Sequence, residues 1–264
     1  MCLGVLRRGR VVAVLRAAFR NLGARHEVGD GRPSLNGVDT AVAWLALAVS
    51  VGVAADLAAD AVSRPRPHVI AYALGMGMFA LATVALAIAV TFGWTEPIYK
   101  VFFLFGAVLN IPYLGLGSVY LVAGRGPARF YQAVLAVFTL VSILVVVPAT
   151  VTSLPESGIP AASETFAAEW LRYLAALGGG VGATLLVVLA VVSIVRFWKA
   201  DRRLVWANAL IVAGVLAASY RGTALALVGE AGGFALALLA AAVLIWAGYR
   251  VASGQRRKTQ ADSA

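Results

Sequence analysis

Apolar and polar positions follow one another along the chain in long blocks. Seven almost entirely apolar runs are separated by short polar segments, and they cover residues 40–59, 70–92, 99–123, 131–151, 173–197, 204–221 and 231–250. An apolar helix of about 20 residues crosses the ~30 Å hydrocarbon core of a bilayer. The runs lack the period-two alternation of barrel strands, so lipid leaves the helix as the way to pair their backbone groups. The pattern predicts an all-α, polytopic transmembrane bundle of seven spans over residues 38–250.

Composition agrees with a chain built for lipid. Of the 264 residues, 61% are hydrophobic and 13% are charged, whereas soluble domains are about half apolar and a quarter charged. The net charge of +10 does not indicate nucleic-acid binding, because the basic residues flank the apolar runs. The lipid bilayer is therefore the expected partner. Arginine rather than lysine supplies most of the positive charge, and with the abundant Ala, Gly and Val this favours a bacterial protein of the cytoplasmic membrane.

The basic residues are unevenly divided between the two sides of the predicted bundle. The loops after the first, third and fifth runs, together with the C-terminal tail, contain Arg64, Arg66, Arg125, Arg129, Arg196, Lys199, Arg202, Arg203, Arg250, Arg256, Arg257 and Lys258. The opposite loops contain only Lys100, Arg172 and Arg221. Lys and Arg are retained on the cytoplasmic side of a membrane. Seven spans then place the N-terminus outside and the C-terminus inside, with residues 251–264 as a basic, disordered cytoplasmic tail.

The N-terminal tail, residues 1–37, conflicts with this orientation because it is rich in arginine. Its apolar stretch VVAVL is too short for a signal peptide. One explanation is an amphipathic helix on the membrane surface, with Val11, Leu15 and Phe19 on one face. A second is that translation starts later, for example at Val28 or Val38, so that the tail is not part of the protein. A third is an eighth span. The sequence leaves these alternatives open.

The third run, FFLFGAVLNIPYLGLGSVYLVAG, has an unusual polar strip. Its members recur at intervals of four and three residues, which places them on one face of a regular helix: Gly106, Asn110, Tyr113, Gly117, Tyr120 and Gly124. Pro112 removes a backbone donor and predicts a kink. Asn110 lies near the middle of the run, where an amide needs a partner. It either bridges helices by hydrogen bonds, or it lines a polar cavity together with Tyr113 and Tyr120. Asn208 of the sixth run is expected to meet Tyr120.

Two further features of the runs are candidates for function or packing. Asp56 lies about one turn before the end of the first run. A carboxylate inside the membrane is costly and is typical of proton or cation handling, but at the interface it would pair with Arg64 or Arg66. Gly178 and Gly182 form a small-xxx-small pair, the pattern typical of closely packed membrane helices.

Enzyme chemistry is not expected from these residues. The chain has two histidines, the single Cys2 and no lysine within the last run, so it predicts no metal site, no cofactor and no nucleophile–base pair. An intramembrane enzyme would need Asp56 and Asp60 in one pocket. Our first expectation is a small-solute or ion permeation module. The alternative is a sensor or accessory subunit that binds a lipophilic ligand, a membrane protein partner or a second copy. A continuous cavity from Asn110 to Asp56 would favour permeation, and a sealed bundle with an exposed Gly/Ala seam would favour the second class.

Overall fold

The computed structural model describes residues 37–154, 159–160, 165–168, 170–197, 202–219 and 230–253. These residues are helical apart from short connections and one isolated antiparallel bridge between Val151 and Phe166. The predicted N-terminal tail up to residue 36, and the C-terminal tail beyond residue 253, lie outside the described residues. What the sequence predicts for the two tails therefore stays a prediction.

The described helices follow the apolar runs. They are α2 (Gly37–Ser63), α3 (Pro67–Phe92), α4 (Glu96–Phe102), η1 (Phe103–Leu109), α5 (Asn110–Val122), α6 (Arg125–Val146), α8 (Leu171–Ala175), η2 (Ala176–Val181), α9 (Gly182–Phe197), α10 (Arg202–Ser219) and α12 (Glu230–Ser253). The segments η1 and η2 are π-helical. The third run is thus one continuous rod of α4, η1 and α5, and the fifth is a rod of α8, η2 and α9.

Six stretches of the described chain are long and apolar enough to cross a membrane: Thr40–Ser63, Pro67–Phe92, Glu96–Val122, Arg125–Val146, Leu171–Arg196 and Gly233–Val251. In α10 the apolar part, Val205–Ala217, is shorter. At 1.5 Å per residue it extends about 20 Å, less than the ~30 Å hydrocarbon core. The prediction of an all-α, apolar bundle is confirmed, and the bundle is compatible with an integral membrane protein in contact with lipid. The count of seven spans stays a prediction.

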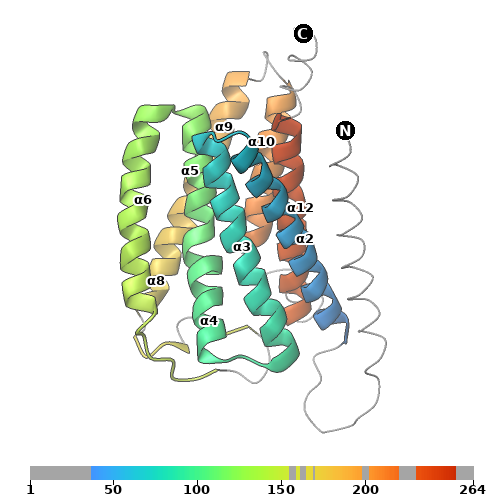
Figure 1. Cartoon of the computed structure of the whole chain (residues 1–264), viewed down its shortest axis with the longest axis vertical. Helices are drawn as coiled ribbons and strands as arrows, with labels where there is room; N and C mark the ends of the chain where they lie inside the picture. Colours follow the sequence, from blue (N-terminus) through green and yellow to red (C-terminus); the bar gives the residue numbers. More distant parts are fainter. Residues whose placement is uncertain are drawn as a thin grey trace.

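The described helices run side by side (Figure 1). Among the described helices a closed circuit of contacts is formed: α2 packs on α3, α3 on α5, α5 on α9, α9 on α10, α10 on α12, and α12 on α2. The described helix α6 lies outside this circuit, against α5 and η1. The rod α4–η1–α5 is the most buried of the six candidate spans. The third run is therefore the central element of the bundle.

The turns between successive helices follow from their glycines and prolines. Gly93 (φ 91°) ends α3, and Gly124 (φ 85°) separates α5 from α6, both in a backbone conformation that glycine adopts readily. Arg66 is extended (φ −119°, ψ 138°) before Pro67, as expected for a residue that precedes proline. These local preferences keep the connections short and place consecutive helices next to each other.

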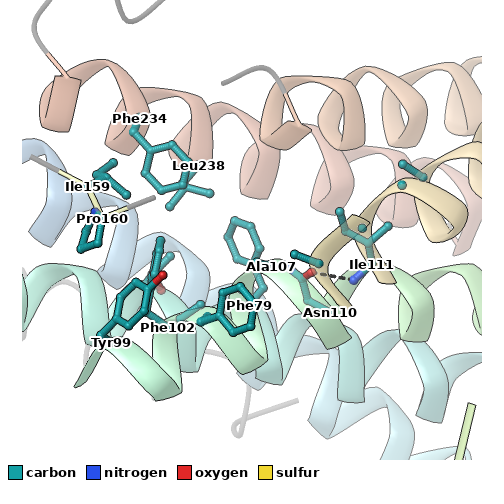
Figure 2. A pocket seen from close by; sticks show the side chains of 18 residues that line it. Phe79, Tyr99, Phe102, Ala107, Asn110, Ile111, Ile159, Pro160, Phe234 and Leu238 are labelled. Atoms are coloured by element: carbon teal, nitrogen blue, oxygen red, sulfur yellow. Dashed lines mark hydrogen bonds between the residues drawn. The ribbon is translucent and has the colours of Figure 1, made fainter. Parts of the chain in front are cut away.

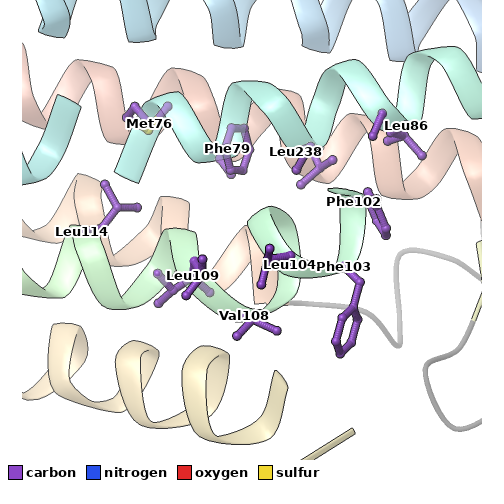
Figure 3. Close-up of a cluster of buried hydrophobic side chains, with 14 of the residues drawn as sticks. Met76, Phe79, Leu86, Phe102, Phe103, Leu104, Val108, Leu109, Leu114 and Leu238 are labelled. Carbon is purple, nitrogen blue, oxygen red and sulfur yellow. The ribbon is translucent and has the colours of Figure 1, made fainter. Parts of the chain in front are cut away.

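The largest buried cluster lies where α3, η1 and α5 meet. Met76 and Phe79 of α3 lie on the side of that helix that faces Leu114 of α5, and Val108 of η1 lies on the side of the rod away from α3 (Figure 3). Val108 and Leu109 have no exposed surface. The wider π turn of η1 therefore lies in the centre of the protein, and not on its lipid-facing surface.

A glycine seam joins η1 and α5 to η2 and α9. Pro112 has no N–H, so it cannot donate the i→i−4 hydrogen bond to the carbonyl oxygen of Val108. That oxygen lies against Gly178, where a Cβ atom would overlap with it. At Gly182 a Cβ atom would lie 3.0 Å from the nitrogen of Pro112. The two backbones approach this closely because positions 178 and 182 carry no side chain.

The seam yields a prediction for Gly178→Ala. Alanine is normally favoured over glycine in a helix by ~0.5–1 kcal/mol, but overpacking costs ~1–3 kcal/mol, and here the added methyl group meets backbone. We expect Gly178→Ala to lower the midpoint of thermal unfolding in detergent micelles. The matched control is Gly77→Ala, since a Cβ atom at position 77 meets nothing within 4 Å. Equal midpoints for the two variants would show that the seam is not tightly packed.

Candidate functional site

A pocket of about 410 Å³ lies in the half of the bundle in which α4 begins (Figure 2). Its described lining comes from α3, from the rods α4–η1–α5 and α8–η2–α9, from α12, and from Ile159 and Pro160. Five of these lining residues are aromatic: Phe79, Tyr99, Phe102, Phe103 and Phe234. None of the described lining residues carries a charge. The pocket is therefore suited to an uncharged, lipophilic molecule.

Both π-helical segments contribute small residues to the pocket wall. Gly106 and Ala107 come from η1, and Gly179 and Gly180 come from η2. Gly106 lies close to α3, because a Cβ atom there would be 3.0 Å from the Cβ atom of Ala82. A π turn is rare and is often found at functional sites. Two such turns beside one pocket make it the best-supported candidate site of the described chain.

Asn110 is a polar side chain at the inner end of the pocket. It is 4% exposed, and its Oδ1 accepts a hydrogen bond from the backbone N–H of Ile111 at 2.6 Å (Figure 2). No described residue accepts a hydrogen bond from its Nδ2. The Asn110 amide thus offers unused N–H donors beside an apolar, aromatic wall.

Aromatic side chains support the other end of the pocket. The ring of Phe166 lies 5.2 Å from that of Tyr99 and 5.0 Å from that of Phe103. Backbone hydrogen bonds hold this segment, from the Thr152 N–H to the Thr165 carbonyl (2.9 Å) and from the Ala167 N–H to the Thr150 carbonyl (3.1 Å). The connection between α6 and α8 is therefore tied to the pocket wall through Phe166.

Trp94 extends the aromatic cluster beyond the pocket. Its ring packs edge to face on Tyr99 at 5.9 Å and on Phe102 at 5.3 Å. Phe102 in turn lies 6.0 Å from Phe234 of α12, across the pocket. A molecule in the pocket would thus be separated from Trp94 by the ring of Tyr99 or Phe102.

The tyrosines of the predicted strip lie elsewhere. Tyr113 hydrogen-bonds Thr139 at 3.2 Å, and the hydroxyl of Tyr120 donates to Gln132, both on α6. Gly117 lies under the ring of Tyr72 of α3, where a Cβ atom would be 2.9 Å away. Neither tyrosine lines the pocket that contains Asn110. The strip is therefore divided between neighbours, with its tyrosines facing α6.

The end of α6 is attached by Lys100. The Nζ atom of this side chain donates to the carbonyl oxygen of Val147, at the C-terminus of α6, at 2.8 Å, and to Glu96 at 2.6 Å. A cation at a helix C-terminus is favourable because the last carbonyl groups lack intrahelical donors. With the tyrosine contacts, Lys100 holds an otherwise exposed helix against α4–η1–α5.

Asn208 lies away from the pocket as well. Its Nδ2 donates to the Oγ of Ser193 at 2.6 Å, which links α10 to α9. The expected contact between Asn208 and Tyr120 is not formed, and the hydroxyl of Tyr120 donates to Gln132 instead. The Asn208 amide instead provides a hydrogen-bond donor to Ser193, which is 4% exposed.

Asp56 and Asp60 tie α2 to α12. Asp56 Oδ2 accepts a hydrogen bond from Trp246 at 3.1 Å and lies 3.4 Å from Arg250, and Asp60 accepts one from Tyr249 at 3.0 Å. The interfacial alternative anticipated an arginine partner for Asp56 from the neighbouring loop, but the partner comes from the last helix. Neither carboxylate lines the pocket. Among the described residues there is no group of three or more His, Cys, Asp or Glu that could hold a metal ion.

Sequence reasoning did not identify the aromatic wall of the pocket. The segment EPIYKVFF, at the start of the third run, carries Tyr99, Phe102 and Phe103 and was a visible signal. Phe79 and Phe234 come from α3 and α12 and had no such signal, because single phenylalanines are ordinary in apolar helices. Comparisons with family models, with curated proteins and with solved structures find no match. The chemistry of the pocket is therefore argued from its own residues.

The contacts of Asp56 yield a second prediction. Its side chain is 35% exposed and that of Arg250 is 44% exposed, so their ion pair contributes at most about 1 kcal/mol. Asp56→Asn keeps an oxygen acceptor for Trp246 and should change the midpoint of thermal unfolding little. Asp56→Ala leaves the indole N–H without this acceptor and should lower the midpoint further. A larger loss in Asp56→Asn than in Asp56→Ala would contradict this assignment.

Proposed function

We propose that this protein is an integral membrane protein that binds an uncharged, lipophilic small molecule in the pocket beside Asn110. Its role would be that of a membrane sensor or an accessory subunit, which passes the bound state to a membrane protein partner or to a second copy of itself. The observation that carries this proposal is the buried Asn110 amide, whose N–H donors face a pocket with aromatic walls and no charged residue in its described lining.

Permeation of a small solute or ion is the weaker proposal. It requires a path that continues from Asn110 to Asp56. The described lining of the pocket includes neither Asp56 nor Tyr113, Tyr120 or Asn208. These four side chains instead make helix-to-helix contacts. We also propose that the protein is not an enzyme, because the described residues that line the pocket include no carboxylate, imidazole or amine to act as a base.

We further propose seven spans in a bacterial cytoplasmic membrane, with the N-terminus outside and the C-terminus inside. Support comes from the end of the bundle where α3, α6 and α10 begin, which carries Arg64, Arg66, Arg125, Arg129, Arg196, Arg202 and Arg250. The opposite end has Glu96, Lys100 and Arg172. Described tryptophans lie toward both ends, Trp206 and Trp246 toward the first and Trp44, Trp94 and Trp170 toward the second. Arginine on one side and tryptophan at both interfaces are typical of a membrane protein.

Ligand binding is tested with Nile red, an uncharged fluorescent lipophile with a carbonyl acceptor, on protein in lipid nanodiscs. We expect saturable binding to the wild type and none to Ala183→Phe, because Ala183 lines the pocket and a phenyl ring would fill it. Asn110→Leu should weaken binding about tenfold, the equivalent of one hydrogen bond. Ala133→Phe is the matched control, since Ala133 is exposed on α6. Equal binding to all four proteins would refute the pocket as the site.

Permeation is tested with the same protein in vesicles under an imposed proton gradient. If the pocket only binds, the internal pH should follow the leak of empty vesicles for both the wild type and Asp56→Asn. The carboxylate lies outside the pocket, and its ion pair with Arg250 is partly exposed. A proton flux in the wild type that disappears in Asp56→Asn would overturn this expectation and make permeation the leading proposal.

A further inference from the structure

We infer that the ligand of this pocket is a flat, conjugated carbonyl compound of the quinone type. The inference rests on the proposed function, because it names the chemical class that the same pocket would bind. Three properties of the described lining carry it: aromatic walls, a hydrogen-bond donor at one end, and the lack of charge.

The walls favour a flat ring over a flexible aliphatic chain. Phe79 of α3, Phe102 of α4 and Phe234 of α12 approach the pocket from three helices (Figure 2). Aromatic rings prefer offset or edge-to-face contact with other rings, which is worth ~0.5–1.5 kcal/mol beyond the area that is buried. An alkyl chain would bury the same area without this gain. The aromatic lining therefore selects for a conjugated ring.

The polar end of the pocket requires an acceptor on the ligand. Asn110 Oδ1 already accepts from the Ile111 N–H, whereas the Nδ2 donors have no described acceptor. The hydroxyl of Thr83, which also lines the pocket, already donates its proton to the Ala80 carbonyl. A ligand carbonyl oxygen beside Asn110 would satisfy the unused donor.

Size and charge narrow the class further. A volume of about 410 Å³ is within the range of pockets that hold drug-sized ligands, and it accommodates a bicyclic ring with a substituent. A carboxylate or an ammonium group would lose its hydration in a pocket whose described lining offers no counter-charge. A quinone combines a flat conjugated ring, carbonyl acceptors, zero charge and solubility in lipid.

The neighbouring tryptophan provides a direct readout. Quinones quench indole fluorescence at short range, and Trp94 packs on Tyr99 and Phe102 of the pocket wall. We expect 2-methyl-1,4-naphthoquinone to quench part of the tryptophan emission of the protein in nanodiscs, in a saturable manner. The saturable part should be missing in Trp94→Phe and in Ala183→Phe, and should persist in the control Ala133→Phe.

The role of the carbonyl group is tested by competition against Nile red. In the wild type, 2-methyl-1,4-naphthoquinone should displace Nile red at a concentration about tenfold lower than 2-methylnaphthalene, which has the same rings and no acceptor. In Asn110→Leu the two compounds should compete equally. Quenching that Ala183→Phe leaves unchanged, or equal competition in the wild type, would overturn the inference. Saturable Nile red binding in that case would leave the proposed function standing, whereas no saturable Nile red binding would refute both.

Discussion

The missing N–H of Pro112 is the constraint on which the centre of this bundle depends. In lipid, each backbone carbonyl must find a partner or a close-packed surrounding, because no water reaches it. Proline leaves the Val108 carbonyl without its usual helical donor, and this residue belongs to the π-helical segment η1. The carbonyl lies against the backbone of Gly178, in the second π-helical segment, η2. One lost hydrogen bond is thus linked to two wide turns, a glycine seam and the pocket that both turns line.

The same rod organises its other neighbours through different side chains. Its tyrosines and Lys100 hold α6, which buries little else against the bundle. Its glycines bring α3 close, and its aromatic start reaches Phe234 on α12. Asp56 and Asp60 likewise connect α2 to α12, two helices that are far apart in sequence. Polar groups in this bundle therefore mostly fix which helices are neighbours, and the Asn110 amide nitrogen is the exception among those discussed.

The apolar runs predicted the helical bundle well, because the thickness and polarity of a bilayer set the length and apolar character of a helix that crosses it. Both properties can be read from the sequence without knowing how the helices pack. The polar strip was a less reliable guide, because spacing shows which side chains share one face of a helix but not which neighbouring helix each of them meets. Gly106 and Asn110 line the pocket, whereas Tyr113 and Tyr120 of the regular helix α5 bond to α6. The partners of Asp56 lie about 190 residues away, which spacing within one run cannot reveal. A pocket built from several helices is likewise a property of packing, although the aromatic residues of the segment EPIYKVFF indicated one of its walls.

The pocket's surroundings determine how such a site would discriminate among ligands. A lipophile that enters from the bilayer exchanges one apolar environment for another, so burial alone contributes little to specificity. Discrimination must then come from the shape of the aromatic walls and from the hydrogen bond that Asn110 can donate. In water a single neutral hydrogen bond is worth ~0.5–1.5 kcal/mol, because the unbound partners are already hydrated. In lipid, the carbonyl group of an unbound ligand finds few hydrogen-bond donors. The Asn110 amide is buried whether or not a ligand is bound. One amide at the end of an apolar pocket can therefore separate carbonyl-bearing ligands from the hydrocarbons that surround the protein in large excess.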